Sequence, residues 1–520
     1  MSSRTLPAPG DVPSQAALPA VSSPTKIATA RAGVATAIAT FAMAGASAAQ
    51  AVLYLSRFGV DGRTDGFFVA FALYTTFGVF GQSIRLTAVP LLVGRRPQLT
   101  TRELAGALLI VTAPVLLVTC ALAEPVARLL AGGLSSADRS VTVAALPILG
   151  VAMTLQLWAS GGATVLAVRA RFGAIAVGYV AGAAAGLAAF LMLMDVAGEL
   201  TLGWSMLTMA VVDCAVLLAF VRRSGGWAAE RRRMRIVRLL RLTGRLIGRT
   251  VIYFAFNGLF IVTLAFASHS ATGDTTVLSY AYLFASYLVA GTGTALGMSR
   301  IADMSRSGGA DRRAAIIETI PGGLRYALLI VAPALAVLIV AGAPLVHVVL
   351  PNSLDEQGVR SLQTFTALLV PWVAAALLAS LLMPAMFALG RAVLVNVLAL
   401  PLVVVHLVAT LVGNALYGVD GSVAAMAVAP ACFAAAMLAT VAGPRTAQVA
   451  RATAGGCLRF LGLAGAAYGA AAAIAVALPS PAAAALVAAA VGSALYLGGA
   501  VLVARPQLDL LAGVVRPRTT

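Results

Sequence analysis

The chain has 520 residues, of which 61% are hydrophobic and only 10% are charged. Soluble globular chains carry about 45 to 50% apolar and about 25% charged residues, so this composition excludes a water-soluble fold. The apolar runs are much longer than the alternating strands of a membrane barrel, and helices are the other backbone that satisfies its hydrogen bonds in hydrocarbon. We therefore expect an all-α integral membrane protein.

The net charge of +18 does not indicate a nucleic-acid partner, because the basic residues lie between the apolar runs. The four cysteines have no metal-binding or disulfide spacing, and the three histidines are far apart. Nucleotide-binding GxxxxGK[ST] and zinc-binding HExxH motifs are absent from the sequence. We expect neither an enzyme nor a bound cofactor or metal, and a proton, sodium or the membrane potential could drive a transport reaction.

Fourteen apolar segments approach or exceed the roughly 20 residues that cross a bilayer as a helix. We place them, in chain order, at 32–55, 67–93, 104–123, 141–167, 174–194, 201–221, 250–268, 277–299, 319–349, 361–389, 392–413, 422–442, 460–478 and 483–504. With both termini in the cytosol, 29 of the 36 basic residues lie in cytosolic loops and tails, as the positive-inside rule requires.

This map divides the chain into six regions. They are a disordered, Pro- and Ser-rich cytosolic tail at 1–30, a first lobe at 31–221, a basic amphipathic cytosolic linker at 222–249, a second lobe at 250–442, a final helix pair with its preceding loop at 443–504, and a cytosolic tail at 505–520. The two lobes begin on the same side of the membrane, so we expect them to form a parallel pseudo-repeat. In such transporters the substrate path lies between the repeats.

The linker contains ten arginines and the single acid Glu230. Five of the arginines recur at helical spacing with apolar residues between them: Arg235, Arg238, Arg241, Arg245 and Arg249. This pattern is typical of a helix that lies on an anionic lipid surface. An ordinary positive-inside linker without a specific lipid role remains the alternative.

Ionisable residues within membrane helices are costly and mark function or pair with each other. Arg85 and Asp213 each lie eight residues before the cytosolic end of their expected helices, at 67–93 and 201–221, about 12 Å deep at 1.5 Å per residue. They can form a structural pair, or either can face a wet cavity. Both are candidate transport residues.

Further candidates for the transport path are polar residues at or near helix faces. The helix at 277–299 carries a stripe of small and hydroxylated residues, of which Tyr282 and Ser286 suit a polar lumen and the glycines suit close packing. We add Asp65, Asn257 and Gln50 as substrate or transport candidates, and Arg57 and Arg63 as gating residues in the first outward loop.

Two stretches resemble the MurJ-type (MviN) lipid II flippases, a branch of the multidrug, oligosaccharidyl-lipid and polysaccharide exporter superfamily. Thr64 to Leu73, TDGFFVAFAL, resembles the family's T-D-A-F-F-x-A-F, and Pro90 matches the proline that ends that segment. Five residues of the second stretch fall in register with the pattern G-x-A-L-G-x(7)-S: Gly293, Ala295, Leu296, Gly297 and Ser305.

The resemblance implies a V-shaped transporter whose lobes alternate access around a cationic cavity, with a lipid-tail groove at the last two helices. The arginines that similar flippases carry in helices one and eight are replaced here by Ala44, Gln50 and Leu283, and the acid of helix eight by Tyr282. Arg85 is the remaining intramembrane guanidinium of the first lobe, and guanidinium groups bind diphosphates best. The substrate expected is a lipid-linked glycan precursor, either lipid II or a related polyprenyl-diphosphate-linked sugar.

We therefore expect a monomeric flippase in the cytoplasmic membrane of a bacterium. Its partners would be the lipid-linked oligosaccharide, anionic membrane lipids and, as a further candidate, proteins of cell-wall synthesis. Two alternatives stay open: an ion-coupled exporter of drugs or small amphiphiles, and a transport-inactive scaffold of an envelope-synthesis complex.

Overall fold

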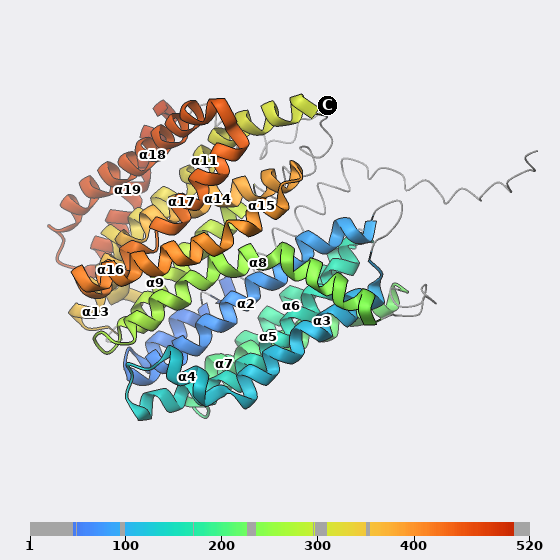
Figure 1. Cartoon of the computed structure of the whole chain (residues 1–520). Coiled ribbons are helices and arrows are strands. Elements are labelled where there is room, and N and C mark those ends of the chain that lie inside the picture. The colour runs from blue at the N-terminus through green and yellow to red at the C-terminus, as the bar shows by residue number, and fades with distance from the viewer. Residues whose placement is uncertain are drawn as a thin grey trace, which may run out of the picture.

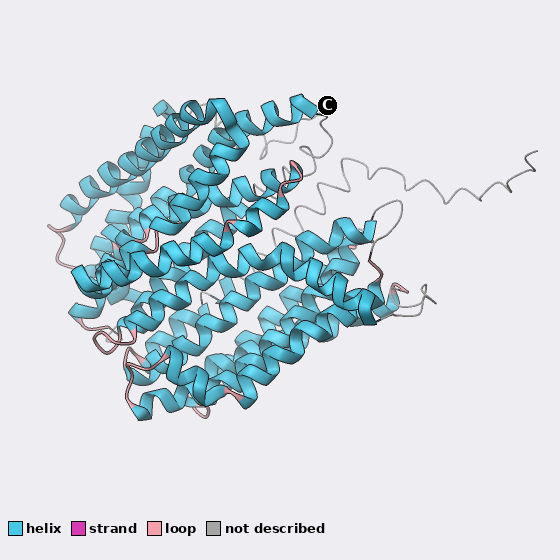
Figure 2. Ribbon diagram, viewed as in Figure 1, coloured by secondary structure: helices cyan, strands magenta, loops and turns pink. Residues whose placement is uncertain are grey.

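The computed structural model describes residues 45–47, 49–93, 99–169, 171–225, 236–294, 296, 309–349 and 354–503. Every regular element among these residues is a helix (Figure 2). Ten helical segments of this part of the chain are long and apolar enough to cross a membrane. The all-α membrane architecture is thus confirmed. The count of fourteen crossings stays a prediction, because most of the expected first helix lies outside the described residues.

The first lobe is a bundle centred on one long helix. Its helices are α2 (Gly62–Val93), α3 (Thr101–Leu116), α4 (Ala123–Leu130), α5 (Ser136–Val168), α6 (Phe172–Leu193) and α7 (Thr201–Arg223). Helix α5 packs against α2, α3 and α7. Glycines at these contacts let the helices approach closely, as Gly81 of α2 does beside Ser160 of α5. Close packing of this kind drives helix association in lipid.

The second lobe is also a bundle of packed helices. Its helices are α8 (Ile236–Ala267), α9 (Asp274–Val289), α11 (Gly309–Val340), α12 (Gly342–Val349), α13 (Glu356–Leu368), α14 (Val370–Ala388), α15 (Ala392–Val397), α16 (Ala399–Ala425) and α17 (Val428–Ala442). Helix α14 packs against α17 and α11, and α16 packs against α8. Figure 1 shows α8 and α2 adjacent at the junction of the two lobes.

A tight reversal within α16 separates two of the expected spans. Gly418 has φ 61° and ψ −143°, a conformation that interrupts a helix and favours glycine. The backbones of Gly413 and Gly421 touch, since an added Cβ on either would overlap the carbonyl oxygen of the other. Residues eight apart cannot touch in a straight helix. The chain therefore turns back at Gly418, as expected between the spans at 392–413 and 422–442.

Helices α18 (Thr446–Ala475) and α19 (Pro481–Val503) form a pair at one edge of the molecule (Figure 1). They pack on each other and on α11. The Tyr496 hydroxyl donates to the Leu329 carbonyl (3.1 Å), which fixes α19 to the second lobe. Large apolar side chains such as Leu458 and Leu502 stay exposed on this pair, which suits contact with lipid.

Helix α8 is longer than the sequence indicated. It starts at Ile236, within the stretch assigned to the linker, and continues without a break into the expected membrane span. Leu239, Leu242 and Leu246 are buried in one apolar cluster with residues of α3. These leucines therefore pack against the first lobe, whereas Ile236, Val237 and Leu240 are exposed, and contact of this segment with lipid stays a prediction.

Candidate functional site

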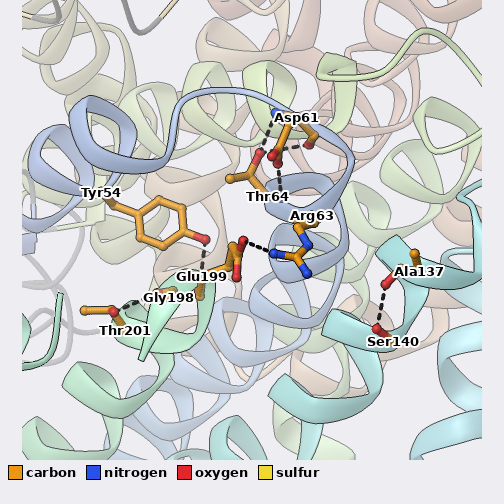
Figure 3. Close-up of polar contacts among 9 residues, drawn as sticks. All are labelled: Tyr54, Asp61, Arg63, Thr64, Ala137, Ser140, Gly198, Glu199 and Thr201. Atoms are coloured by element: carbon orange, nitrogen blue, oxygen red, sulfur yellow. Dashed lines mark hydrogen bonds and ion pairs between the residues drawn. The ribbon is translucent and has the colours of Figure 1, made fainter. Parts of the chain in front are cut away.

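The start of α2 is fixed by reciprocal hydrogen bonds between Asp61 and Thr64. The Thr64 N–H donates to Asp61 Oδ1 (2.8 Å), and the Asp61 N–H donates to Thr64 Oγ1 (2.9 Å) (Figure 3). These bonds cap the first turn of a helix, where the N–H groups have no intrahelical acceptor. The next residue, Asp65, is fully buried.

Asp65 reaches the other lobe and accepts three hydrogen bonds at the beginning of α9. The Gly273 N–H donates to Oδ2 (2.6 Å), and Thr276 donates to Oδ1 through its N–H (2.8 Å) and its hydroxyl (2.7 Å). Gly273 has a φ of 95°, a left-handed conformation that favours glycine. A carboxylate at this position satisfies free N–H groups and complements the helix dipole. We call these three bonds the Asp65 latch.

Burial and hydrogen bonding shift the pKa of the Asp65 carboxyl in opposite directions. Removal from water raises the pKa of Asp65 from 3.8 to about 6, although the donors of Thr276 and Gly273 act in the opposite direction. Asp65 lies in the first turn of α2, before the membrane span expected from residue 67. The latch therefore titrates closer to neutral pH than an exposed aspartate does.

Further contacts join the lobes at the same end of the bundle. The Tyr280 hydroxyl of α9 donates to the Ala51 carbonyl (2.9 Å), and the Tyr280 ring packs against Phe68 of α2 with ring centroids 5.1 Å apart. The Ser268 hydroxyl, just after α8, donates to the Ala265 carbonyl (2.8 Å) and lies 3.5 Å from the Leu130 carbonyl at the end of α4. We call this the Asp65 end, and the opposite end, where α7 ends and α8 begins, the linker end. The lobes are in contact at the Asp65 end.

Arg57 and Arg63 lie at the Asp65 end and form ion pairs within the first lobe. Arg57 pairs with Asp195 (3.0 Å), and Arg63 pairs with Glu199 (3.0 Å), as Figure 3 shows for the second pair. The Tyr54 hydroxyl donates to the Glu199 carbonyl (2.9 Å). Both arginine side chains are exposed, and exposed pairs of this kind contribute roughly 0 to 1 kcal/mol. These bonds hold the turn between α6 and α7 against the start of α2. The gating role of Arg57 and Arg63 stays a prediction.

The candidates from the second lobe are held by their own lobe in this conformation. Tyr282 is buried and stacks on Phe260 of α8, with ring centroids 3.8 Å apart and planes 4° apart. The Ser286 hydroxyl donates to the Leu283 carbonyl (2.9 Å), and the Asn257 amide donates to the Tyr253 carbonyl (2.9 Å). Their transport role stays a prediction.

Asp213 and Gln50 are both buried in the first lobe. The Asp213 carboxyl has no hydrogen-bond partner among the described residues, and neither has the Gln50 Oε1 atom. Arg85 lies within α2, but its side chain is outside the described part of the structure. The proposed pairing of Arg85 with Asp213 therefore stays a prediction.

Of the linker arginines, Arg238 has a defined protein partner. Its Nε donates to Glu103 Oε1 at 2.7 Å, and Glu103 is buried at the start of α3. Arg241 and Arg245 are exposed, whereas Arg235 and the side chain of Arg249 lie outside the described residues. The ion pair fixes the beginning of α8 to the first lobe.

A family model described as lipid II flippase MurJ matches residues 55–480. The chain belongs to the lipid II flippase MurJ family. A structure of lipid II flippase MurJ in an inward closed conformation aligns with a TM-score of 0.67 and 12% identity, and covers 93% of this chain and 99% of that one.

Two multidrug transporters of the MATE family share the fold. One, in an inward-facing conformation, has a TM-score of 0.59 at 11% identity and covers 80% of this chain and 99% of its own. The other, VcmN from Vibrio cholerae, has a TM-score of 0.55 at 12% identity and covers 81% and 97%. A search of curated protein sequences finds no match. The fold is thus shared by the MurJ family and the MATE transporters.

The sequence singled out Asp65 as a transport candidate, a role that stays a prediction, but did not indicate its partners on α9. The signal available was the Gly-Asp-Thr-Thr run at 273–276, which follows a loop and opens a helix. Nothing in that run indicates that the capping carboxylate comes from more than 200 residues away. Glu103, which holds the linker arginine, was also missed, since it reads as an ordinary capping-box acid at the start of a helix.

Proposed function

We propose that the chain translocates a lipid-linked cell-envelope glycan precursor, lipid II or a related polyprenyl-diphosphate-linked sugar, from the inner to the outer leaflet by alternating access. The membership of 426 residues, 55–480, in the lipid II flippase MurJ family carries this proposal. The two-lobed helical architecture with an added helix pair at its edge supports it.

In this proposal the Asp65 end faces outward and the linker end faces the cytosol of a bacterium, as the distribution of basic residues predicts. The latch between Asp65 and α9 then closes the outer side of the path while the substrate loads from the inner leaflet. Release requires the latch to open. Because its three bonds join the two lobes at this end, the latch is suited to act as the outer gate.

The inner side of the protein would bind anionic lipid through the exposed arginines of α8. Arg241 and Arg245 lie on the face opposite the leucines that pack on α3. Each basic residue near an anionic surface contributes about 1 kcal/mol of attraction. This contact would hold the linker end at the headgroup level, and the same face could meet proteins of cell-wall synthesis.

Growth rescue tests the proposal. We expect this chain to restore growth to a bacterium depleted of its resident lipid II flippase, and we expect Arg85→Ala to abolish rescue at normal abundance in the membrane. Arg85→Lys should rescue only partly, since an ammonium lacks the planar fork that binds a diphosphate. Reduced abundance of Arg85→Ala would instead indicate a structural pair with Asp213.

A failure to rescue at normal abundance would exclude lipid II as the substrate. The purified chain in liposomes would then be tested with a fluorescent polyprenyl-diphosphate sugar. Absence of flipping in that assay would overturn the flippase proposal and favour the exporter or the scaffold.

A further inference from the structure

Arg325 lies within a helix of the second lobe and has no acidic partner among the described residues. It is half-buried on α11, nine residues after Ile316, where an apolar segment long enough to cross a membrane begins. The ion pairs and side-chain hydrogen bonds of the described part of the chain do not include it. The nearest acid on α11, Glu318, is exposed and lies two turns away, about 10 Å at 1.5 Å per residue. Ionisable groups within membrane helices pair with one another or bind a ligand, so this guanidinium needs a counter-ion.

The Arg325 side chain faces α18. Its Cγ and Nε atoms lie 3.2 and 3.6 Å from the position that a Cβ on Gly456 would take. Helices α11 and α18 pack against each other, and both begin at the linker end (Figure 1). There Arg313 of α11 donates to the Val441 carbonyl at the end of α17 (2.8 Å), just before α18 starts. Arg325 therefore lies at the junction between the second lobe and the final helix pair.

Two exposed arginines of α18 mark the level of this contact relative to the lipid. Arg451 and Arg459 lie on either side of Gly456 along the helix. After Arg459, α18 has no charged residue up to its end at Ala475. An exposed arginine is costly in hydrocarbon but favourable among headgroups, so the edge of the hydrocarbon lies close to Arg459. The contact between Arg325 and Gly456 is thus at the level of lipid headgroups.

Arg325 and Arg459 are placed to reach one ligand. Arg459 follows Gly456 by three residues, so the two positions lie on the same side of α18, one turn apart. Space remains beside Arg325, because a Cβ added at Gly322 or Gly455 would meet no atom within 4 Å. Guanidinium groups bind phosphate through charge-assisted hydrogen bonds. Two of them beside open space at headgroup level therefore favour a lipid phosphate as the ligand.

We propose that Arg325 and Arg459 bind the phosphate group of an anionic phospholipid in the leaflet at the linker end. The level of the site, at the edge of the hydrocarbon, favours a lipid over a soluble phosphate. The two positive charges favour a lipid with net negative charge over a zwitterionic one, because the ammonium group of a zwitterionic lipid is repelled. The bound lipid bridges α11 and α18 and holds the final helix pair on the second lobe.

Native mass spectrometry of the purified full chain in detergent tests the site. All variants carry Arg241→Gln and Arg245→Gln, which remove the exposed arginines of α8 as a second source of lipid binding. Phosphatidylglycerol should bind more tightly than phosphatidylcholine. Arg325→Ala and Arg459→Gln should each weaken its binding roughly fivefold, as expected for the loss of one basic contact to an anionic lipid. The matched control is Arg391→Ala, at an exposed arginine in the turn between α14 and α15, which should leave the affinity unchanged.

A double variant decides whether the two arginines share one lipid. If one phosphate contacts both, the loss of affinity in Arg325→Ala with Arg459→Gln should be smaller than the product of the two single losses. A loss equal to that product would mean two separate lipids and would overturn the shared site.

Arg459 is exposed, so Arg459→Gln stays informative if Arg325→Ala does not fold. Three further results would overturn the proposal: equal binding of phosphatidylcholine, unchanged binding in Arg459→Gln, or an equal loss in Arg391→Ala. Displacement of the lipid by inorganic phosphate at similar concentration would also overturn it, because the ligand would then be a soluble anion. Because every readout is binding rather than transport, failure of the flippase proposal would leave this test unaffected.

Discussion

The Asp65 latch predicts how strongly two backbone N–H groups of α9 are protected from hydrogen exchange. Gly273 and Thr276 lie in the first turn, where N–H groups have no intrahelical acceptor, and both donate to Asp65 at 2.6 and 2.8 Å. A hydrogen bond to a charged group contributes about 1.5 to 3 kcal/mol. At about 1.36 kcal/mol per factor of ten, Asp65→Ala should raise exchange at these two amides roughly 10- to 150-fold.

Asp65→Asn should give a graded result. The asparagine keeps one oxygen as an acceptor but turns an NH₂ group toward the second donor, so one amide stays protected and the other is exposed to exchange. Residue-resolved exchange by mass spectrometry over residues 268–280 measures both amides. Asp274→Asn is the matched control, because Asp274 accepts hydrogen bonds from Ser270 and Ala271 within its own turn. Unchanged exchange at Gly273 and Thr276 in Asp65→Ala would refute the latch.

Three further predictions concern pH, the linker and topology. The pKa of Asp65 is about 6 in the closed latch and 3.8 for an exposed aspartate, so the closed state binds more protons between these pH values. The closed Asp65 end should therefore lose stability as pH rises through this interval. Hydrogen exchange, corrected for its intrinsic pH dependence, should show this loss in the unaltered chain and not in Asp65→Asn. Glu103→Gln should cost roughly 1 to 2 kcal/mol of the docking of α8 and speed exchange near Arg238, because that pair is partly buried. With single cysteines, an impermeant reagent outside intact cells should label Ser353→Cys and not Ser224→Cys; the reverse pattern would invert the topology.

Hydropathy predicted the positions of the helices because span length and composition are local properties of the sequence. The expected span at 201–221 is α7 (Thr201–Arg223), and the span at 174–194 is α6 (Phe172–Leu193). The beginning of α8 was harder to predict. Its arginines recur at helical spacing, and the sequence alone does not show whether the leucines between them bury against lipid or against protein. The partner surface on α3 decides this, and it is distant in sequence.

Candidate sites were predicted by residue type and not by partner. Burying a carboxyl group is costly, so acidic residues in or beside the expected spans are candidates from the sequence alone, and Asp65 and Asp213 are two of them. Asp65 is satisfied by α9 of the other lobe, and Asp213 lies against Gly182 on a neighbouring helix. No periodicity or motif in the sequence predicts either contact, because each depends on how separate helices pack in space.

The latch and α8 together constrain how the lobes can move. At the linker end, Leu239, Leu242 and Leu246 belong to the apolar cluster of the first lobe, whereas Ile252 and Phe256 belong to the cluster that includes the second lobe. Between Leu246 and Ile252 the helix therefore passes from the cluster formed with the first lobe to a cluster that spans both lobes. If the lobes alternate access as proposed, opening the Asp65 end would rotate one lobe against the other while Glu103 holds the beginning of α8 on the first lobe. The strain must be taken up by bending in this short segment, which contains Gly248, a residue that lowers the stiffness of a helix. In the proposed cycle, a latch at one end and a helical joint at the other would favour rocking of the lobes over sliding.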